Sequence, residues 1–161
     1  MGHAANYETD ILEWSERQAA ALRDLARARP DLSNRIDWEN VAEEIETVGR
    51  NERDAVRSQV RRILEHFLKL AYSPAREPRF DWMGSIVDAR SELGDKLSAT
   101  LRRDIEEALG KLYGQARKRV TLDLQKFGEQ EAAATLPVEC PYTPDQILAE
   151  DWYPEPPEQK K

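Results

Sequence analysis

The sequence predicts an all-α fold, a single-domain up-down helical bundle with one long central helix and a proline-rich C-terminal tail. Apolar residues recur at three- and four-residue steps along four segments, which is the spacing of one face of an α-helix. No segment alternates apolar and polar residues with a period of two, so no sheet is expected. Charged residues make up 34% of the 161 residues, a surplus that suits long solvated helix faces.

The first helical segment begins near Tyr7, with Thr9 as the expected N-cap. It ends before Pro30, because a residue that precedes proline is pushed out of the helical region. The residues that share one face of this segment are Ile11, Trp14, Gln18, Leu22 and Leu25.

The second segment carries the same spacing over a much longer stretch. Asp37 is expected to cap it, and the stripe resumes in phase on the far side of Gly49. We therefore expect one long helix that ends at Tyr72, with two helices broken at Gly49 as the alternative. The stripe consists of Trp38, Val41, Ile45, Val48, Val56, Ile63, Phe67 and Leu70.

Two further helices and a tail complete the chain. Asp81 is expected to cap the third helix, a turn is expected near Ser98, and Gly128 is a natural stop for the fourth helix. A short helical turn is expected after Thr143. We place the helical domain at residues 1–150 and a flexible proline-rich tail at residues 151–161, whose last prolines favour disorder.

Composition excludes several classes of function. The net charge of -7 provides no field that attracts nucleic acid, so a nucleic-acid partner is not expected. Cys140 is the only cysteine, which excludes an intrachain disulfide and a multi-cysteine metal site. No apolar run approaches the roughly 20 residues of a membrane span, and the N-terminus lacks signal-peptide features. We expect a cytoplasmic protein without a membrane partner.

Four stretches together resemble a bacterial family known only as domain of unknown function 29. They are YETDILEW, DWENVAEEIETVGRNER, LEHFLKLAYSP and CPYTPDQILAEDWYPE, in this order along the chain. The resemblance implies an all-helical, single-domain protein that occupies almost the whole chain, and it implies no established activity. The turn around GDKLSAT is shorter than the linker that the family usually has there.

Charged residues follow one side of the long helix. A basic stripe there could grip phosphates, but pairing with neighbouring glutamates on a solvated face is the more economical interpretation. The carboxylates Glu43, Glu44 and Glu46 are a weak signal for a metal site, because such a site needs inward-facing Glu residues and Glu-x-x-His pairs, and a solvated acidic face is the favoured interpretation. No metal or cofactor is expected. The stripe runs through Glu39, Glu43, Glu46, Arg50, Arg53, Arg57 and Arg61.

Polar residues also interrupt the apolar faces. Glu52, Gln59 and His66 climb the long helix in seven-residue steps, and Arg90 interrupts the third helix. One hypothesis is a polar layer between helices, with Arg90 as the partner of Glu52. The other is a pocket in which Glu52 is a general base, His66 an acid or base and Arg90 an anion clamp.

These patterns favour a non-enzymatic interaction or regulatory module, with a protein as its partner. The hypothesis rests on charged helix faces without a phosphate loop, a metal spacing or a catalytic triad. The alternative is a small-molecule-binding protein or hydrolytic enzyme with an inter-helix site around Glu52, His66 and Arg90. Whether the chain is an enzyme stays open at this point.

Overall fold

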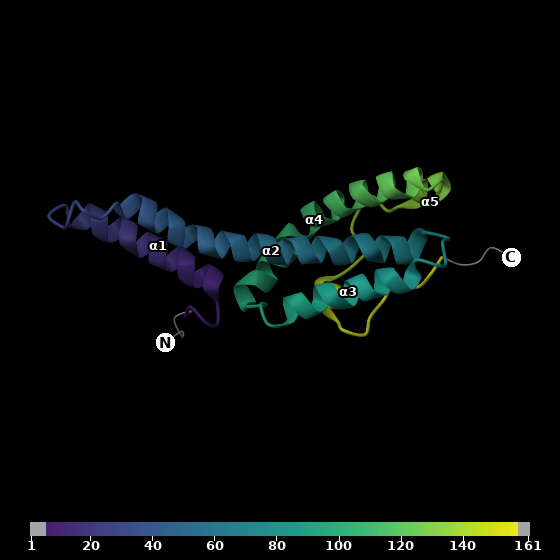
Figure 1. Cartoon of the computed structure of the whole chain (residues 1–161), viewed down its shortest axis with the longest axis horizontal. Helices are drawn as coiled ribbons and strands as arrows, with labels where there is room; N and C mark the ends of the chain where they lie inside the picture. Colours follow the sequence, from purple (N-terminus) through teal and green to yellow (C-terminus); the bar gives the residue numbers. More distant parts are fainter. Residues whose placement is uncertain (1–5, 158–161) are drawn as a thin grey trace. The chain divides into compact units, whose positions relative to one another are not determined.

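The computed structural model describes residues 6–157, which form α-helices and no strand (Figure 1). The predicted all-α class is confirmed. Among these residues, no helix combines the length and the apolar composition that crossing a membrane requires. The helices are α1 (Ile11–Ala28), α2 (Trp38–Tyr72), α3 (Arg79–Gly94), α4 (Ala99–Lys126), α5 (Gln130–Thr135) and α6 (Pro144–Leu148).

The chain divides into two compact helical units. The first consists of Met1–Val56 and Leu97–Asp104, and the second consists of Arg57–Lys96 and Ile105–Lys161. The long helix α2 therefore contributes its first half to one unit and its second half to the other. As the phase of its apolar stripe predicted, α2 continues through Gly49 without a break.

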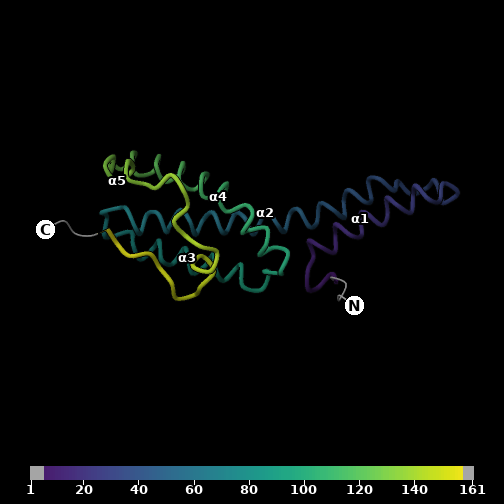
Figure 2. The backbone as a smooth tube through the Cα atoms, turned by 180° about the vertical axis from the view of Figure 1, so that it is seen from behind, coloured from purple at the N-terminus to yellow at the C-terminus, as the bar shows by residue number. Residues whose placement is uncertain are grey.

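In the first unit, α1 runs antiparallel to the first half of α2 (Figures 1 and 2). Asp10, and not the predicted Thr9, caps α1, since its carboxylate accepts a hydrogen bond from the Glu13 amide over 3.0 Å. Small side chains predominate where the two helices meet. The buried residues at this contact are Leu12, Ser15 and Ala19 on α1, with Ala42 and Gly49 on α2.

Gly49 lies inside α2, and because it has no side chain, α1 can pack closely against it. A Cβ atom at position 49 would lie 2.0 Å from Ser15 Oγ and 3.2 Å from the Leu12 Cα. Ser15 turns its hydroxyl back to the main-chain oxygen of Leu12, so the close approach leaves no buried donor without a partner. The glycine therefore sets the distance between two helices and does not end one.

In the second unit, α3 and α4 lie along opposite sides of the second half of α2 (Figures 1 and 2). Hydrogen bonds tie α2 to both neighbours, through Arg62 to Ser85 on α3 and through Lys69 to Asp123 on α4. The apolar core between them is nearly solvent-free. It includes Val60, Ile63, Leu64, Phe67, Leu68, Ile86, Ala89, Leu93, Ile105, Ala116 and Val120.

Three helix boundaries follow from local chemistry. α3 begins at Arg79 after Pro78, so the prediction of Asp81 as its cap was wrong by one turn. The Ser98 hydroxyl accepts from the Leu101 amide at the start of α4, where a turn was predicted. Gly128 has a φ of 79°, the left-handed conformation that ends a helix. The short α5 was not predicted.

The tail, residues 136–157, packs on the second unit. Thr143 and Gln146 form a capping box for α6, and Ile147 is fully buried, in agreement with the predicted turn. Figure 2 shows the tail leaving α5 and crossing towards α3. Its contacts continue through Trp152 and Tyr153, beyond residue 150, where we expected flexibility to begin. The end of the expected disordered stretch, residues 158–161, lies outside the described residues.

Candidate functional site

The four residues of the expected polar site are divided between the two units. Glu52 belongs to the first unit, whereas Gln59, His66 and Arg90 belong to the second. Within the described part of the chain, no hydrogen bond or ion pair joins Gln59, His66 and Arg90 to one another. Each of these three side chains has its own partner instead.

Arg90 is held by the main chain of the tail. Its guanidinium is buried and donates to the carbonyl oxygens of Ile147 at 2.9 Å, Gln146 at 3.0 Å, Trp152 at 2.8 Å and Glu150 at 3.3 Å. These hydrogen bonds go to carbonyl oxygens, whereas a carboxylate, that of Glu52, was the expected partner. Carbonyl oxygens at the C-terminal end of a helix lack intrahelical donors and favour a cation, and α6 presents two of them here.

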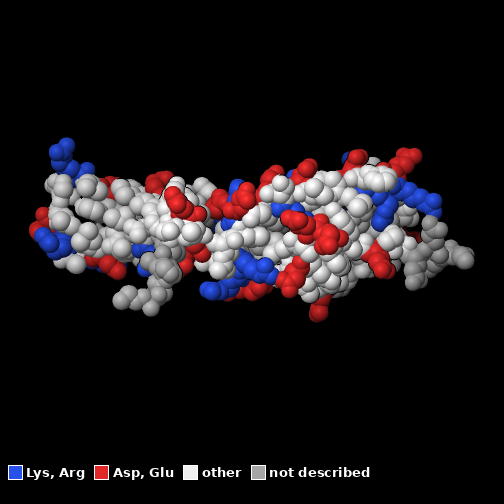
Figure 3. Space-filling view, turned by 90° about the horizontal axis from the view of Figure 1, so that it is seen from below, with Lys and Arg blue, Asp and Glu red and all other residues white. Residues whose placement is uncertain are grey.

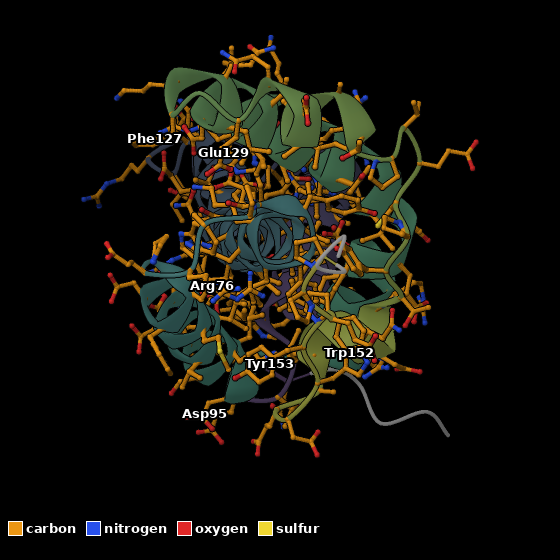
Figure 4. The ribbon with its side chains drawn as sticks, turned by 90° about the vertical axis from the view of Figure 1, so that its right-hand side faces the viewer. Arg76, Asp95, Phe127, Glu129, Trp152 and Tyr153 are labelled. Atoms are coloured by element: carbon orange, nitrogen blue, oxygen red, sulfur yellow. The ribbon has the colours of Figure 1, made fainter. Side chains whose placement is uncertain are left out.

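Aromatic rings enclose the same guanidinium. Its central carbon lies 5.4 Å from the centre of the Phe67 ring and 5.2 Å from that of Tyr153. Phe67 in turn packs edge-on against Tyr142 and Trp152, at 5.1 and 5.2 Å between centroids. Figure 4 shows Trp152 and Tyr153 close together on the tail. Burial lowers the pKa of Arg90, and the nearby side chains of Tyr153 and Asp151 oppose this shift. The guanidinium stays protonated, and the carbonyl dipoles and ring faces also favour its charge.

His66 is bound within its own helix. Its Nδ1 lies 2.7 Å from the main-chain oxygen of Arg62, and because this oxygen only accepts, Nδ1 carries the proton of the neutral ring. Burial lowers the pKa of His66, with Lys69 and Arg62 nearby adding repulsion. The imidazole is therefore neutral at neutral pH and serves as a helix-bound packing group.

Gln59 joins α2 to α3. Its amide nitrogen donates to the carboxylate of Glu92, two residues after Arg90. Its Oε1 is shielded from solvent and has no hydrogen-bond partner in the described chain. Gln18 on α1, the other expected interior polar residue, is exposed. Within the second unit, Gln59, His66 and Arg90 therefore do not form one hydrogen-bonded layer.

The start of the tail is fixed on α4. The Tyr113 hydroxyl donates to the Pro137 carbonyl over 2.6 Å, and burial raises the pKa of this tyrosine to about 12. Arg117 donates to the Leu136 carbonyl. Burial also raises the pKa of the half-buried Cys140 thiol, which opposes formation of a reactive thiolate. These contacts make the tail part of the second unit.

The charged side of α2 is an ion-pair network. Arg23 of α1 donates to Glu39 at 2.9 Å and Glu46 at 3.1 Å, while Arg50 donates to Glu43 at 2.7 Å. These bonds raise the pKa of Arg23 and lower that of Glu43. No group of acidic, cysteine or histidine side chains in residues 6–157 could hold a metal ion. Figure 3 shows acidic and basic side chains interspersed over the face in view.

The opposite side of the first unit is apolar. On both helices, the large apolar side chains point about 70–90 degrees away, around the helix axis, from the small buried residues between α1 and α2. The displacement has the same rotational sense on both helices, and because the helices are antiparallel, both stripes come to one side. We call this surface the apolar hairpin face: Ile11, Trp14, Leu22 and Leu25 of α1, with Trp38, Val41, Ile45 and Val48 of α2.

Sequence periodicity identified these residues but placed them in the core. In the structure Leu25, Val41 and Val48 are between 40% and 44% exposed, and the other residues of the face are partly exposed. The misplacement has a physical cause, since Ala19, Ala42 and Gly49 allow a closer helix contact than larger residues do. The sequence did contain a signal for this close contact, since the small residues Ala42 and Gly49 are seven positions apart on the same side of the helix.

The arrangement has known relatives. The family model of domain of unknown function 29 matches residues 6–153. The chain is also similar to a crystal structure of an alpha-helical protein of unknown function from Rhodospirillum rubrum, with 30% sequence identity and a TM-score of 0.81, over 93% of each chain. No curated protein matches the chain.

Proposed function

Because the chain belongs to the domain of unknown function 29 family, whose name carries no activity, we propose a function from its own surfaces. The protein is a non-enzymatic interaction or regulatory module that binds a protein partner through the apolar hairpin face.

The observation that carries this proposal is the exposure of large apolar side chains on two adjacent helices. Single exposed apolar residues are common, but contiguous apolar patches mark interaction sites. Leu25, Val41 and Val48 are exposed while alanine and glycine occupy the interior of the same hairpin. A partner that covers this face would remove from water the apolar surface that the chain itself leaves exposed.

The state of the polar residues supports the same proposal over an enzyme. An anion clamp needs guanidinium donors that point to a ligand, and the hydrogen bonds of Arg90 go to the tail. A general acid or base at His66 needs a ring presented to substrate, and its Nδ1 is bonded to its own helix. The hydrolytic alternative around Glu52, His66 and Arg90 is therefore less well supported.

Site-specific photocrosslinking tests the proposal. A photoreactive amino acid at Val48 of the full chain, in cells that express it, is expected to give a discrete covalent protein adduct. The matched control is the same amino acid at Leu122, an exposed aliphatic position on α4 in the second unit. Equal labelling at both positions, or no adduct at position 48, would contradict the proposal.

A further inference from the structure

We propose that the partner of the apolar hairpin face is the same face of a second copy of this chain, so that two hairpins form an antiparallel four-helix bundle. This inference rests on the proposed function, since it names the occupant of that same face. Most homo-oligomers are closed by a two-fold axis, which requires a surface complementary to itself.

The first argument is the geometry of the hairpin. Each hairpin supplies two antiparallel helices with adjacent apolar stripes, which is half of an up-down four-helix bundle. The close contact between Ser15 and Gly49 brings the two stripes near each other, so their large side chains form one continuous layer. A second hairpin laid on this layer completes the bundle with apolar residues on both sides.

The second argument is the chemistry along the face. From Trp38 to Val48 the stripe of α2 has no charged member, the half-buried Glu52 follows at the next helical step, and Gln18 is the one polar position within the stripe of α1. An amide both donates and accepts hydrogen bonds, so Gln18 can pair with the same residue of another copy. A carboxylate or a guanidinium at this place would instead repel its counterpart.

The third argument is the area. From Ile11 to Leu25 α1 extends roughly 22 Å, and two helices side by side are roughly 20 Å across. The flat footprint is therefore roughly 440 Å² per copy, and side-chain relief makes the accessible area larger. Stable interfaces bury about 800 Å² per partner, so a dimer through this smaller face belongs to the weak, reversible class.

The charges beside the face favour a protein over a membrane surface. Asp37 and Glu44 lie at its α2 edge and are exposed. Helices that bind anionic lipid surfaces carry Lys and Arg on the flanks of their apolar face. The acidic α2 edge repels such lipids, while the α1 edge carries one exposed charge of each sign, Arg17 and Asp24.

Sedimentation equilibrium of the purified full chain, between about 5 and about 500 µM, tests this inference. We expect a dimer of twice the 18.5 kDa of the chain. Val48→Glu and, independently, Leu25→Glu would place a charge in the apolar interface and are expected to weaken the dimer at least about tenfold. Both positions are exposed in the single chain, so both variants should fold, which circular dichroism checks.

Leu122→Glu is the matched control, and it should leave the dimer unchanged. A wild-type chain that stays monomeric over the whole range would overturn the inference. So would a dimer that both face variants leave intact. If the chain is monomeric but position 48 crosslinks to a different protein, the proposed interaction function stands and only the identity of the partner is wrong. If neither occurs, both proposals fail.

Discussion

Arg90 on α3 donates through Nη2 to the main-chain oxygen of Trp152 over 2.8 Å, which connects a buried cation to the far end of the tail. The same side chain binds three other carbonyl oxygens of the tail. An arginine fits this role because its planar fork offers several donors in fixed directions. The charged residue that most resembled an anion clamp thus fastens the C-terminal segment to the helices.

Replacing this arginine should release the tail. Arg90→Met keeps the apolar stem but leaves four buried or half-buried carbonyl oxygens without a donor, so the free energy of unfolding should fall by about 2–4 kcal/mol. Urea denaturation measures the loss, and limited proteolysis should cut the tail first. The control is Arg76→Met at an exposed loop arginine, labelled in Figure 4, which should change stability by less than about 0.5 kcal/mol. Equal stability of both variants would refute the role of Arg90.

Gly49→Ala should destabilise the first unit although alanine is the better helix former. The new Cβ would meet Ser15 Oγ at 2.0 Å, and α1 main-chain and side-chain atoms at 3.1 to 3.2 Å, so the helices must separate. We expect a loss of about 1–3 kcal/mol in thermal or chemical unfolding. Gly110→Ala on α4 is the matched control, because nothing lies within 4 Å of its added Cβ. That control should gain about 0.5–1 kcal/mol, and a gain at both positions would be inconsistent with tight packing at Gly49.

His66 should make stability depend on pH in one direction. Its folded pKa lies below the unfolded value of 6.5, so the unfolded chain binds the proton more readily. The stability that the neutral His66 ring contributes is therefore complete above the unfolded pKa, and it is lost as the pH falls through the folded pKa. The measurement is the free energy of unfolding between about pH 7.5 and about pH 5.5, for the wild type and for His66→Gln.

The difference in pH dependence between the wild type and His66→Gln reports on the imidazole alone, without the titration of nearby carboxylates. Glu65, whose pKa is raised by burial, and Asp123, near His66, are common to both proteins and cancel. The wild type should lose more stability than His66→Gln on acidification. The opposite order, or parallel curves, would show that His66 is not kept neutral by burial.

The basic residues of α2 should not bind nucleic acid. Arg50, Arg53 and Arg61 lie within ion-pair distance of Glu43, Asp54 and Glu65, and the chain carries a net charge of -7. We expect no detectable binding of duplex or single-stranded DNA or RNA in fluorescence anisotropy at physiological salt. Binding that weakens steeply as salt is added would instead show that phosphates displace these carboxylates.

Helical periodicity and capping residues together predicted most of the helices. The phase of the stripe across Gly49 predicted one continuous α2, and Ser98, Gly128 and Thr143 marked real boundaries. These features are local, because caps and helical periodicity involve residues a few positions apart. The caps at Thr9 and Asp81 were misplaced because nearby polar or proline residues offered equivalent starts.

The candidate site depended on information that a single sequence lacks. The partners of Arg90 are main-chain oxygens, which every residue has, so no side chain identified them in advance. In the first unit, hydrophobicity favoured Trp14 and Val48 for the interior, but steric fit between Ser15 and Gly49 decided it. Small residues pack helices closest, and the larger apolar ones then lie beside the contact.

Methyl NMR with a soluble paramagnetic probe tests the central claim, that the large apolar side chains of the hairpin lie outside its own packing. Four valines of α2 serve as a matched set, with Val41 and Val48 exposed and Val56 and Val60 buried. In dilute protein the probe should broaden the methyl signals of the first pair and spare those of the second. Protection of Val41 and Val48 should grow with protein concentration as a second copy covers them. If all four valines are equally protected at every concentration, the account is wrong.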